Sequence, residues 1–336
     1  MEDKQNEFCR SDLSFEVKMR TDSHGLIKIK AVMLGHAVAD ALGVPVEFSS
    51  RAELDCDPVV DMRGWGAYNV PEGCWSDDTS MSLATLDALA QDGLNYESIM
   101  NNFAGWLDDG DYTPTGAVFD VGGTCHAAIR NYTRDKSKSP LECGLDGEYS
   151  NGNGSLMRIH PFVLYAYTRG LSPDSLIEII NNGSSLTHRH EKSKLACLIY
   201  AFVLYNLLNE QSKESVERSL NKANGYFTGV ADMLCFDRIF DKNFSALPRE
   251  QIKGSGYVVD TLEAAMWCLL TTNDYKSCVL KAVNLGDDTD TVAAVAGGLA
   301  GALYGYDSIP NEWLRVLKKR RYIESLCETA FKKWQV

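Results

Sequence analysis

The sequence lacks the features that mark several protein classes. Its ten cysteines include no C-x-x-C pair and no spacing typical of a zinc finger, which argues against a structural zinc site. Several lie within apolar segments, as Cys197 does in LACLIYAFVLYNLL, so we expect reduced, buried thiols in a cytoplasmic protein. Positive charge is scarce, because 33 Lys and Arg face 46 Asp and Glu and give a formal net charge of −13. Nucleic acid is therefore an unlikely partner, since a phosphate-backbone binder needs a basic face.

Long hydrophobic runs are also missing. The longest, Leu195 to Leu208, has the length of a buried core helix and is too short to span a membrane. The N-terminal sequence MEDKQNEFCRSDLSFEVKMR is polar and charged and has no apolar stretch of a signal peptide. We therefore expect no membrane partner. We also expect residues 1–22 to form a polar extension, followed by a single domain over residues 23–336.

Period-2 strand patterns, internal repeats and linker-like segments are hard to find, whereas the helical period dominates. A polar stretch, residues 134–147, is expected to be a surface loop or insertion. We therefore predict an all-α fold, a compact single-domain orthogonal helical bundle, acting as a monomer. The segments with helical spacing are residues 26–42, 82–90, 172–180, 191–208, 258–270, 275–283, 291–304 and 310–331.

Acidic residues are concentrated at one predicted helix start, in NLGDDTDTVAAVAGG, residues 284–298. Asp287, Asp288 and Asp290 lie within four residues, directly before an apolar segment. Helix capping is one interpretation, because acidic side chains satisfy free amides at a helix N-terminus. It accounts less well for three acids at this spacing, since like charges repel.

A second segment, CWSDDTSMSLATLDAL, has the same organisation. Ser76, Asp77, Asp78 and Thr79 form an oxygen-rich cluster before an apolar helix. If the two helix starts converge, their carboxylates cannot all remain ionised without a cation. Every candidate ligand is a hard oxygen, which favours Mg²⁺ or Mn²⁺ over zinc, and the ligand number suits two ions. After Asp290, the apolar segment contains four glycines, Gly297, Gly298, Gly301 and Gly305. Such small residues let helices pack closely, which can give the ligands a rigid mount or can be ordinary helix packing.

Two further segments are candidates for ligand contact. NGNGSLMR contains two Asn-Gly steps, which favour tight turns with positive φ and can aim backbone amides at phosphate oxygens, although a plain surface turn is the alternative. Its Arg158 could meet a diphosphate or pair with an acid, and we favour a structural role. In THRH, two histidines two residues apart are more typical of a solvated turn than of a metal pair.

Together these segments resemble the ADP-ribosylglycohydrolase family, of the dinitrogenase-reductase-activating glycohydrolase type. The matching motifs, in chain order, are GHAVADALGVPVEF (35–48), WSDDTSMSL (75–83), FDVGGTCHAAI (119–129), NGNGSLMRIHPF (151–162) with LTHRH (186–190), and NLGDDTDTVAAVAGGLAGALYG (284–305). The resemblance implies an all-α fold with a binuclear Mg²⁺ or Mn²⁺ centre in a cleft. It also implies a hydrolase that cleaves the bond between ADP-ribose and an acceptor, either a protein side chain or a small conjugate.

Site residues follow from the resemblance position by position. The implied metal ligands are Ser76, Asp77, Asp78, Asp288, Asp290 and Thr291, and Asp287 is expected to support or cap them. Glu47 matches an acid that approaches the metals and the ribose, although on its motif alone an exposed acid after a turn is equally consistent. The expected catalytic group comprises Glu47, Asp77, Asp288 and Asp290, with Asp288 or Asp290 as both ligand and base. The expected substrate contacts are Asp120, Gly122, Gly123, Asn153, Gly154, Ser155, Met157 and His188.

Other functions remain open at this point. The chain could be a catalytically silent relative that binds ADP-ribose or serves structurally, or a two-metal hydrolase of another phosphorylated substrate. The clustered carboxylates argue against the first, and the nucleotide-type loops argue against the second. The sequence leaves the linkage and acceptor undecided, because arginine, serine and other conjugates share the ADP-ribose half.

Overall fold

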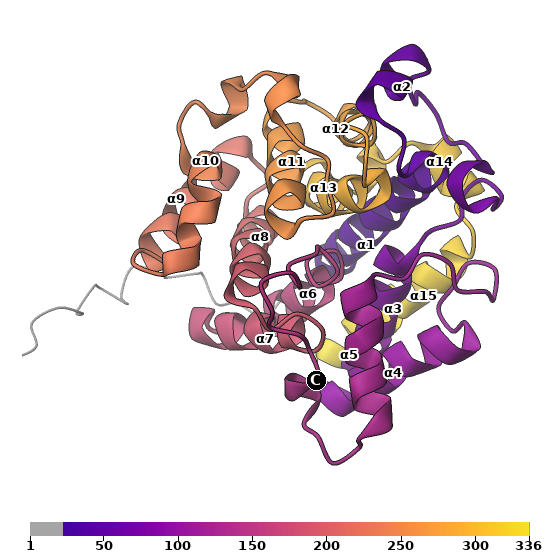
Figure 1. The fold of residues 1–336 in the computed structure, drawn as a ribbon, viewed down its shortest axis with the longest axis vertical. Coiled ribbons are helices and arrows are strands. Elements are labelled where there is room, and N and C mark those ends of the chain that lie inside the picture. The colour runs from indigo at the N-terminus through magenta and orange to yellow at the C-terminus, as the bar shows by residue number, and fades with distance from the viewer. Residues whose placement is uncertain (1–22, 336) are drawn as a thin grey trace, which may run out of the picture.

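Two helices in contact along their backbones form the centre of the molecule. The computed structural model describes residues 23–335, and in it α1 (Ser23–Gly43) lies against α13 (Thr289–Tyr304) (Figure 1). Glycines make this contact possible, because a Cβ on Gly35 would lie 2.6 Å from the Gly297 carbonyl oxygen, and one on Gly301 would lie 2.1 Å from the carbonyl oxygen of Ala31. The close packing expected from these small residues is therefore present.

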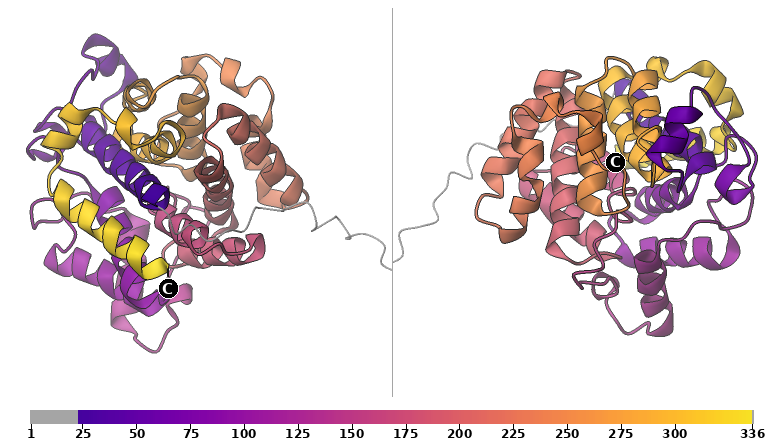
Figure 2. Two further views of the ribbon diagram at one scale, coloured as in Figure 1. Left: turned by 180° about the vertical axis from the view of Figure 1, so that it is seen from behind. Right: turned by 45° about the horizontal axis from the view of Figure 1, so that its top comes forward.

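The other helices surround this pair in two groups. On one side α3 (Asp77–Asp92), α4 (Tyr96–Asp109) and α15 (Arg320–Trp334) pack together, and α15 also runs along α1 (Figure 2). On the other side α11 (Val258–Leu270) and α12 (Tyr275–Val283) pack on α13, and α8 (Glu191–Asn209) joins α11 to α9 (Lys213–Tyr226). The remaining α-helices are α2 Arg51–Cys56, α5 Gly123–Arg134, α6 His160–Thr168, α7 Pro173–Ser185, α10 Asp237–Phe240 and α14 Asn311–Val316.

The predicted all-α fold is confirmed, since the described residues contain helices and isolated bridges but no β-strand. The helices expected at 258–270 and 275–283 have those bounds. The helix expected at 310–331 is wrong as one element, because it breaks into α14 and α15. At the break Lys319 has a φ of 43° and the Lys318 amide donates to the Gly73 carbonyl. The expected extension, residues 1–22, lies outside the described residues.

The polar stretch 134–147 is only partly a surface loop. Cys143 is buried and a Cβ on Gly144 would lie 2.3 Å from the Ser185 carbonyl oxygen. The Leu145 amide donates to the Thr187 carbonyl at 3.0 Å. Its end therefore packs into the body of the fold beside the LTHRH segment.

One described segment, His24–Val46, is long and apolar enough to cross a membrane. It consists of α1 and the short helix η2 (Val44–Val46). Its most apolar window is 89% buried inside the molecule. Its hydrophobicity is thus explained by its place at the centre of the core.

Candidate active site

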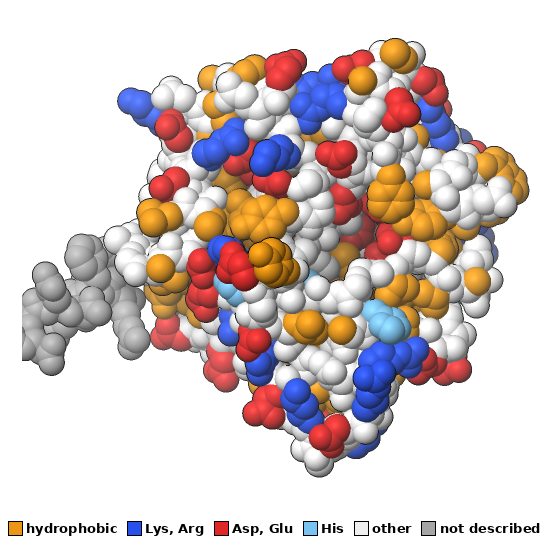
Figure 3. Space-filling model, viewed as in Figure 1, with side chains coloured by type: hydrophobic (Ala, Val, Ile, Leu, Met, Phe, Trp, Pro, Cys, Tyr) orange, Lys and Arg blue, Asp and Glu red, His pale blue; other side chains and the backbone are white. Residues whose placement is uncertain are grey.

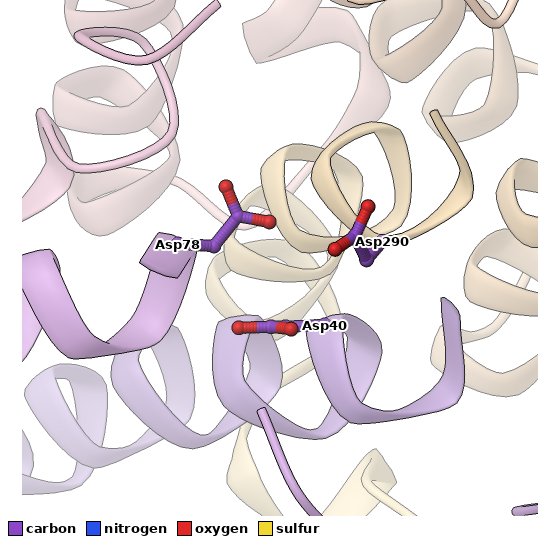
Figure 4. A group of neighbouring side chains, drawn as sticks. All are labelled: Asp40, Asp78 and Asp290. Carbon is purple, nitrogen blue, oxygen red and sulfur yellow. The ribbon is translucent and has the colours of Figure 1, made fainter. Parts of the chain in front are cut away.

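Three helices bring the predicted acidic helix starts together. Asp78 lies in the first turn of α3, Asp290 in the first turn of α13, and Asp40 near the end of α1 (Figure 4). The start of α13 is fixed on α1, since the Thr289 hydroxyl donates to the Gly43 carbonyl at 2.8 Å. A Cβ on Gly43 would lie 2.3 Å from the Asp290 Cα. The glycine therefore sets how closely the two helices approach at the site.

Helix capping and clustering of acids are both present. Ser76 is the N-cap of α3 and accepts from the Asp78 amide, and Asp288 is the N-cap of α13 and accepts from the Thr291 amide. The capping role expected for Asp287 is wrong. That side chain is exposed, and its backbone, with a φ of 63°, bonds to Ser49 instead.

Asp40 was not predicted as a site residue. It is fully buried and accepts three hydrogen bonds from the first turn of α3: the Ser76 amide at 2.9 Å, the Thr79 amide at 3.0 Å and the Thr79 hydroxyl at 2.6 Å. It thereby holds α3 in place. The signal available in the sequence was a single acid within the apolar pattern of residues 26–42.

The acids form two groups that share one member. Asp40, Asp78 and Asp290 can place one oxygen each within 4.8 Å of one another, and so can Glu47, Asp288 and Asp290. Asp290 therefore lies where it could contribute to two adjacent cation sites. Asp77 is in neither group, and one of its carboxyl oxygens accepts from the Gly122 amide at 3.3 Å.

Burial is the main cause of unusual ionisation in this cluster. It raises the pKa of Glu47 to about 8 and the pKa of both Asp40 and Asp120 to about 6. Burial together with neighbouring carboxylates raises the pKa of three further acids well above the usual range, and burial alone raises that of Asp288, whose hydrogen bonds counteract part of the shift. These four are Asp77, Asp78, Asp288 and Asp290. The folded chain thus holds more negative groups here than it can keep ionised by itself.

The cluster fits a hard divalent cation. Both carboxyl oxygens of Asp78, Oδ2 of Asp290 and Oε2 of Glu47 are buried without a hydrogen-bond partner. Within residues 23–335, no ion pair involves any acid of the cluster. Buried carboxylates without partners are costly, and oxygen-only ligand sets suit Mg²⁺ or Mn²⁺.

A cavity of about 210 Å³ lies over the acids. In Figure 3, acidic side chains lie in a recess between two groups of hydrophobic side chains. Among residues 23–335, no Lys or Arg lines the cavity. Its lining includes most predicted site residues: Glu47, Asp77, Asp120, Gly122, Gly123, Asn153, Gly154, Met157, His188, Asp288 and Thr291.

Four predicted residues do not line the cavity. Ser76, Asp78 and Asp290 lie beneath its floor, buried at the helix starts. Ser155 lies behind the wall, where its hydroxyl contacts the Cys197 thiol at 3.5 Å and accepts from the Ser184 hydroxyl at 3.0 Å. The structure therefore gives Ser155 a packing environment and does not bring it into the cavity.

The Asn-Gly segment reaches the cavity differently from the expectation. Neither Gly152 nor Gly154 has a positive φ, so that part of the prediction is wrong, although residues 154–158 do form turns. The segment instead pairs with residues 256–258, for example through the Asn153 amide and the Gly256 carbonyl at 3.0 Å. Gly154 is required for close approach, because a Cβ would lie 2.6 Å from the Cys125 sulfur. The Asn153 side chain donates to Asp288 Oδ2 at 2.8 Å.

The two basic residues near this segment have mainly structural contacts. Arg158 is fully buried and donates to the Gly183 carbonyl and the Thr187 hydroxyl, as favoured from the sequence. The Thr187 hydroxyl also contacts His188 Nδ1 at 2.8 Å. Burial lowers the pKa of His188 to about 3, so a neutral imidazole faces the cavity and the expected solvated turn is wrong.

Tyr68 is a second residue that the sequence did not suggest. It lies in η3 (Gly66–Tyr68), and hydrogen-bonding contact with its hydroxyl lowers the pKa of both Glu47 and Asp120, against the larger effect of burial. Asp120 has a φ of 51°, a strained backbone for a residue other than glycine and a feature common at functional sites. Thr124, Cys125 and Gly256 also line the cavity without having been predicted.

Known proteins resemble this chain in sequence and in fold. The sequence model of the ADP-ribosylglycohydrolase family matches residues 22–336. The chain belongs to the ADP-ribosylglycohydrolase family. This confirms the predicted family and enzyme class, a hydrolase that cleaves glycosyl bonds to ADP-ribose.

Several relatives resemble the chain over most of its length. It is 33% identical to the ADP-ribosylarginine hydrolase Tri1 of Pseudomonas putida, covering 93% of this chain and 80% of the relative. It is 32% identical to the ADP-ribosyl-[dinitrogen reductase] glycohydrolase of Rhodospirillum rubrum, covering 88% and 94%. A solved ADP-ribosylglycohydrolase-related protein complex superimposes with a TM-score of 0.78 at 30% identity, covering 92% of this chain and 99% of the other.

Proposed function

We propose that this chain hydrolyses the N-glycosidic bond between ADP-ribose and an arginine side chain, using two divalent cations at the carboxylate cluster. The observation that carries this is a set of buried acids beneath a cavity, where the described part of the chain places neither a cationic partner for the acids nor a Lys or Arg in the lining. Such a cavity attracts a cationic guanidinium leaving group. The name of the Pseudomonas putida relative specifies the same linkage.

The two acidic groups are the proposed cation sites, with Mg²⁺ or Mn²⁺ as the ions and Asp290 shared between them. Ser76 and Thr291 are proposed as neutral oxygen ligands beside them. Bound cations would offset part of the carboxylate charge, orient the ribose hydroxyls and make a nearby water more acidic. All of these groups come from one copy of the chain, so the proposal requires only a monomer. Free cysteines throughout the described residues suit the cytoplasm.

The rest of the cavity suits the two phosphates and the nucleoside. The N-cap Gly122 of α5 has no side-chain cap, and Gly122 and Gly123 line the cavity with open space where a Cβ would be. Free amides at a helix start favour phosphate oxygens. A neighbouring open pocket of about 460 Å³ shares Gly152 and Gly256 with the cavity and is lined by Tyr149 and Tyr257. An adenine ring can stack there on an aromatic side chain.

Asp120 is the proposed general base. Asp290 lies beneath the cavity floor, and both oxygens of Asp288 accept hydrogen bonds, from Asn153 and Thr291. Asp120 lines the cavity, belongs to neither cation group and has a pKa of about 6 because of burial. We therefore place the base there and not at Asp288 or Asp290.

The reaction exchanges one bond for another. The water oxygen bonds to the anomeric carbon of the ribose, and the carbon–nitrogen bond breaks through an oxocarbenium-like state. The electron pair of that bond remains on the guanidino nitrogen, which takes up a proton. That proton is the one that Asp120 has accepted from the attacking water, so the products are free ADP-ribose and arginine, and Asp120 is ionised again.

The test is ADP-ribose release from arginine-linked and serine-linked conjugates, with Mg²⁺, with Mn²⁺ and after EDTA. We expect cation-dependent release from the arginine conjugate. Asp290→Ala should abolish turnover, and Asp120→Asn should lower kcat by about 100-fold or more. Full activity in Asp290→Ala, or release only from the serine conjugate, would overturn the cation sites or the linkage, respectively.

A further inference from the structure

Three aromatic side chains form a row beside the acidic end of the cavity. The ring centroids of Phe48 and Tyr68 are 6.3 Å apart, and those of Tyr68 and Phe119 are 5.0 Å apart. Phe48 directly follows Glu47 in the sequence, and Phe119 directly precedes Asp120. The row therefore joins the two chain segments that carry these carboxyl groups, and Tyr68 is its central member.

The loop that carries Tyr68 is held by close backbone contacts at both ends. A Cβ on Gly66, which has a φ of 62°, would lie 1.8 Å from the Pro45 carbonyl oxygen. The Trp65 amide donates to the Val70 carbonyl at 2.5 Å, and the Gly73 carbonyl accepts from Lys318. Because the loop rests on the turn that precedes Glu47, the Tyr68 hydroxyl has a defined position relative to that carboxyl group.

The hydroxyl of Tyr68 lies beside two carboxyl groups. Glu47 and Asp120 each have hydrogen-bonding contact with it, and neither has an ion pair among the described residues. Phe48, with a φ of 66°, and Asp120, with a φ of 51°, both have strained backbones. Such strain persists only where the surroundings fix the conformation, and Tyr68 contacts both segments.

The position of the row also indicates which part of a substrate it meets. The cavity continues through Gly152 and Gly256 into the pocket of Tyr149 and Tyr257. A nucleotide that extends from that pocket places its second ribose over the acids. The group attached to this ribose then lies beyond it, on the side where Glu47 and Asp120 meet the aromatic row.

We propose that Tyr68 is a positioning residue of the hydrolysis: its hydroxyl orients Glu47 and Asp120, and its ring, with Phe48 and Phe119, forms the wall beside the acceptor group. This rests on the proposed function, because it assigns Tyr68 to the same site. A planar guanidinium suits a wall of aromatic faces beside carboxylates, since it can stack and donate hydrogen bonds at once.

The experiment compares Tyr68→Phe with the wild type and with Tyr112→Phe. Tyr112 is a matched control, because its hydroxyl donates to Asp87 at 2.9 Å and Asp87, unlike Glu47 and Asp120, does not line the cavity. We expect Tyr68→Phe to lower kcat for the arginine conjugate by about 10- to 100-fold. KM and the dissociation constant of ADP-ribose, measured by calorimetry, should change less than about threefold, since the ADP-ribose contacts remain.

A second readout separates orientation of the acids from a structural role. In Tyr68→Phe the acidic limb of the pH profile of kcat should move, whereas in Tyr112→Phe it should not. Tyr68→Gln, which keeps a donor, should recover part of the kcat that Tyr68→Leu loses. Equal kcat and pH profiles in Tyr68→Phe and the wild type would overturn the role of Tyr68 alone. Absence of release by the wild type from every conjugate would instead overturn the proposed function and this inference with it.

Discussion

Replacing Glu47 by glutamine should stabilise the cation-free protein, and the gain should grow with pH. Burial, followed by the charge of Asp120, raises the pKa of Glu47 from 4.5 to about 8. A carboxyl group whose pKa is higher in the folded than in the unfolded state binds protons more tightly when folded, so it costs stability as pH rises from about 4.5 towards 8. Integrated over that window, the cost is about 1 kcal/mol at pH 5 and about 3 kcal/mol at pH 7.

The cost converts into a measurable change of melting temperature. An unfolding entropy of about 2.1 cal/mol/K per residue gives about 0.7 kcal/mol/K for a chain of this length. Glu47→Gln should therefore raise Tm by about 4 °C at pH 7 and by about 1 °C at pH 5. The assay is calorimetric unfolding of EDTA-treated protein between pH 5 and pH 8.

A matched control lies beside the cluster. Asp287→Asn removes the same formal charge, but Asp287 is exposed and its backbone, not its side chain, makes the contact with Ser49. Its Tm should follow the wild type at every pH. An equal gain in both variants, or no gain in Glu47→Gln at pH 7, would refute the argument that a buried, unpartnered carboxylate destabilises the cation-free state.

Four further outcomes are expected. Adding Mg²⁺ or Mn²⁺ at about 100 times Kd should raise the unfolding free energy of the wild type by about 2.7 kcal/mol. The gain should be smaller at pH 5 than at pH 7, because protons compete with the cation for the carboxylates. Unfolding scans with and without the cation check this. Gly301→Ala should cost about 1–3 kcal/mol in denaturant unfolding, because its Cβ meets the α1 backbone at 2.1 Å. The control Gly225→Ala in α9, with nothing within 4 Å of its Cβ, should be neutral or stabilising. Asn153→Ala removes the donor to Asp288 and should weaken Mn²⁺ binding by about tenfold in calorimetric titration. Tyr257→Ala should raise KM by about tenfold in steady-state kinetics with little change in kcat, since stacking lies far from the reacting bond.

The helix starts were predictable because local sequence determines them. Asp78 and Asp288 each stand before an apolar segment with helical spacing, and the charge conflict between two such starts already indicated a cation. Asp40 was missed because a single acid in an apolar helix gives no sign of where it points until α3 is placed against α1.

Features that depend on tertiary packing could not be predicted from the local sequence. The Asn-Gly steps were expected to need glycine for a positive φ, whereas Gly154 is needed because the Cys125 sulfur lies where its Cβ would be. Tyr68 reaches Glu47 only because Gly66 lets one loop rest on Pro45. Neither contact has a local sequence pattern, since each joins segments that are distant in the chain.

The grouping of Asp290 with Asp40 and Asp78 has a consequence for how the protein is made. Asp40 and Asp290 are 250 positions apart in the sequence, and closing a loop of that length costs about 5 kcal/mol of chain entropy. Cations that bind both would help to offset this cost by tying the first described helix to a late one. A nascent chain that has not yet released α13 from the ribosome has no complete site. Cation binding would therefore distinguish chains in which α13 has joined α1 from chains in which it has not.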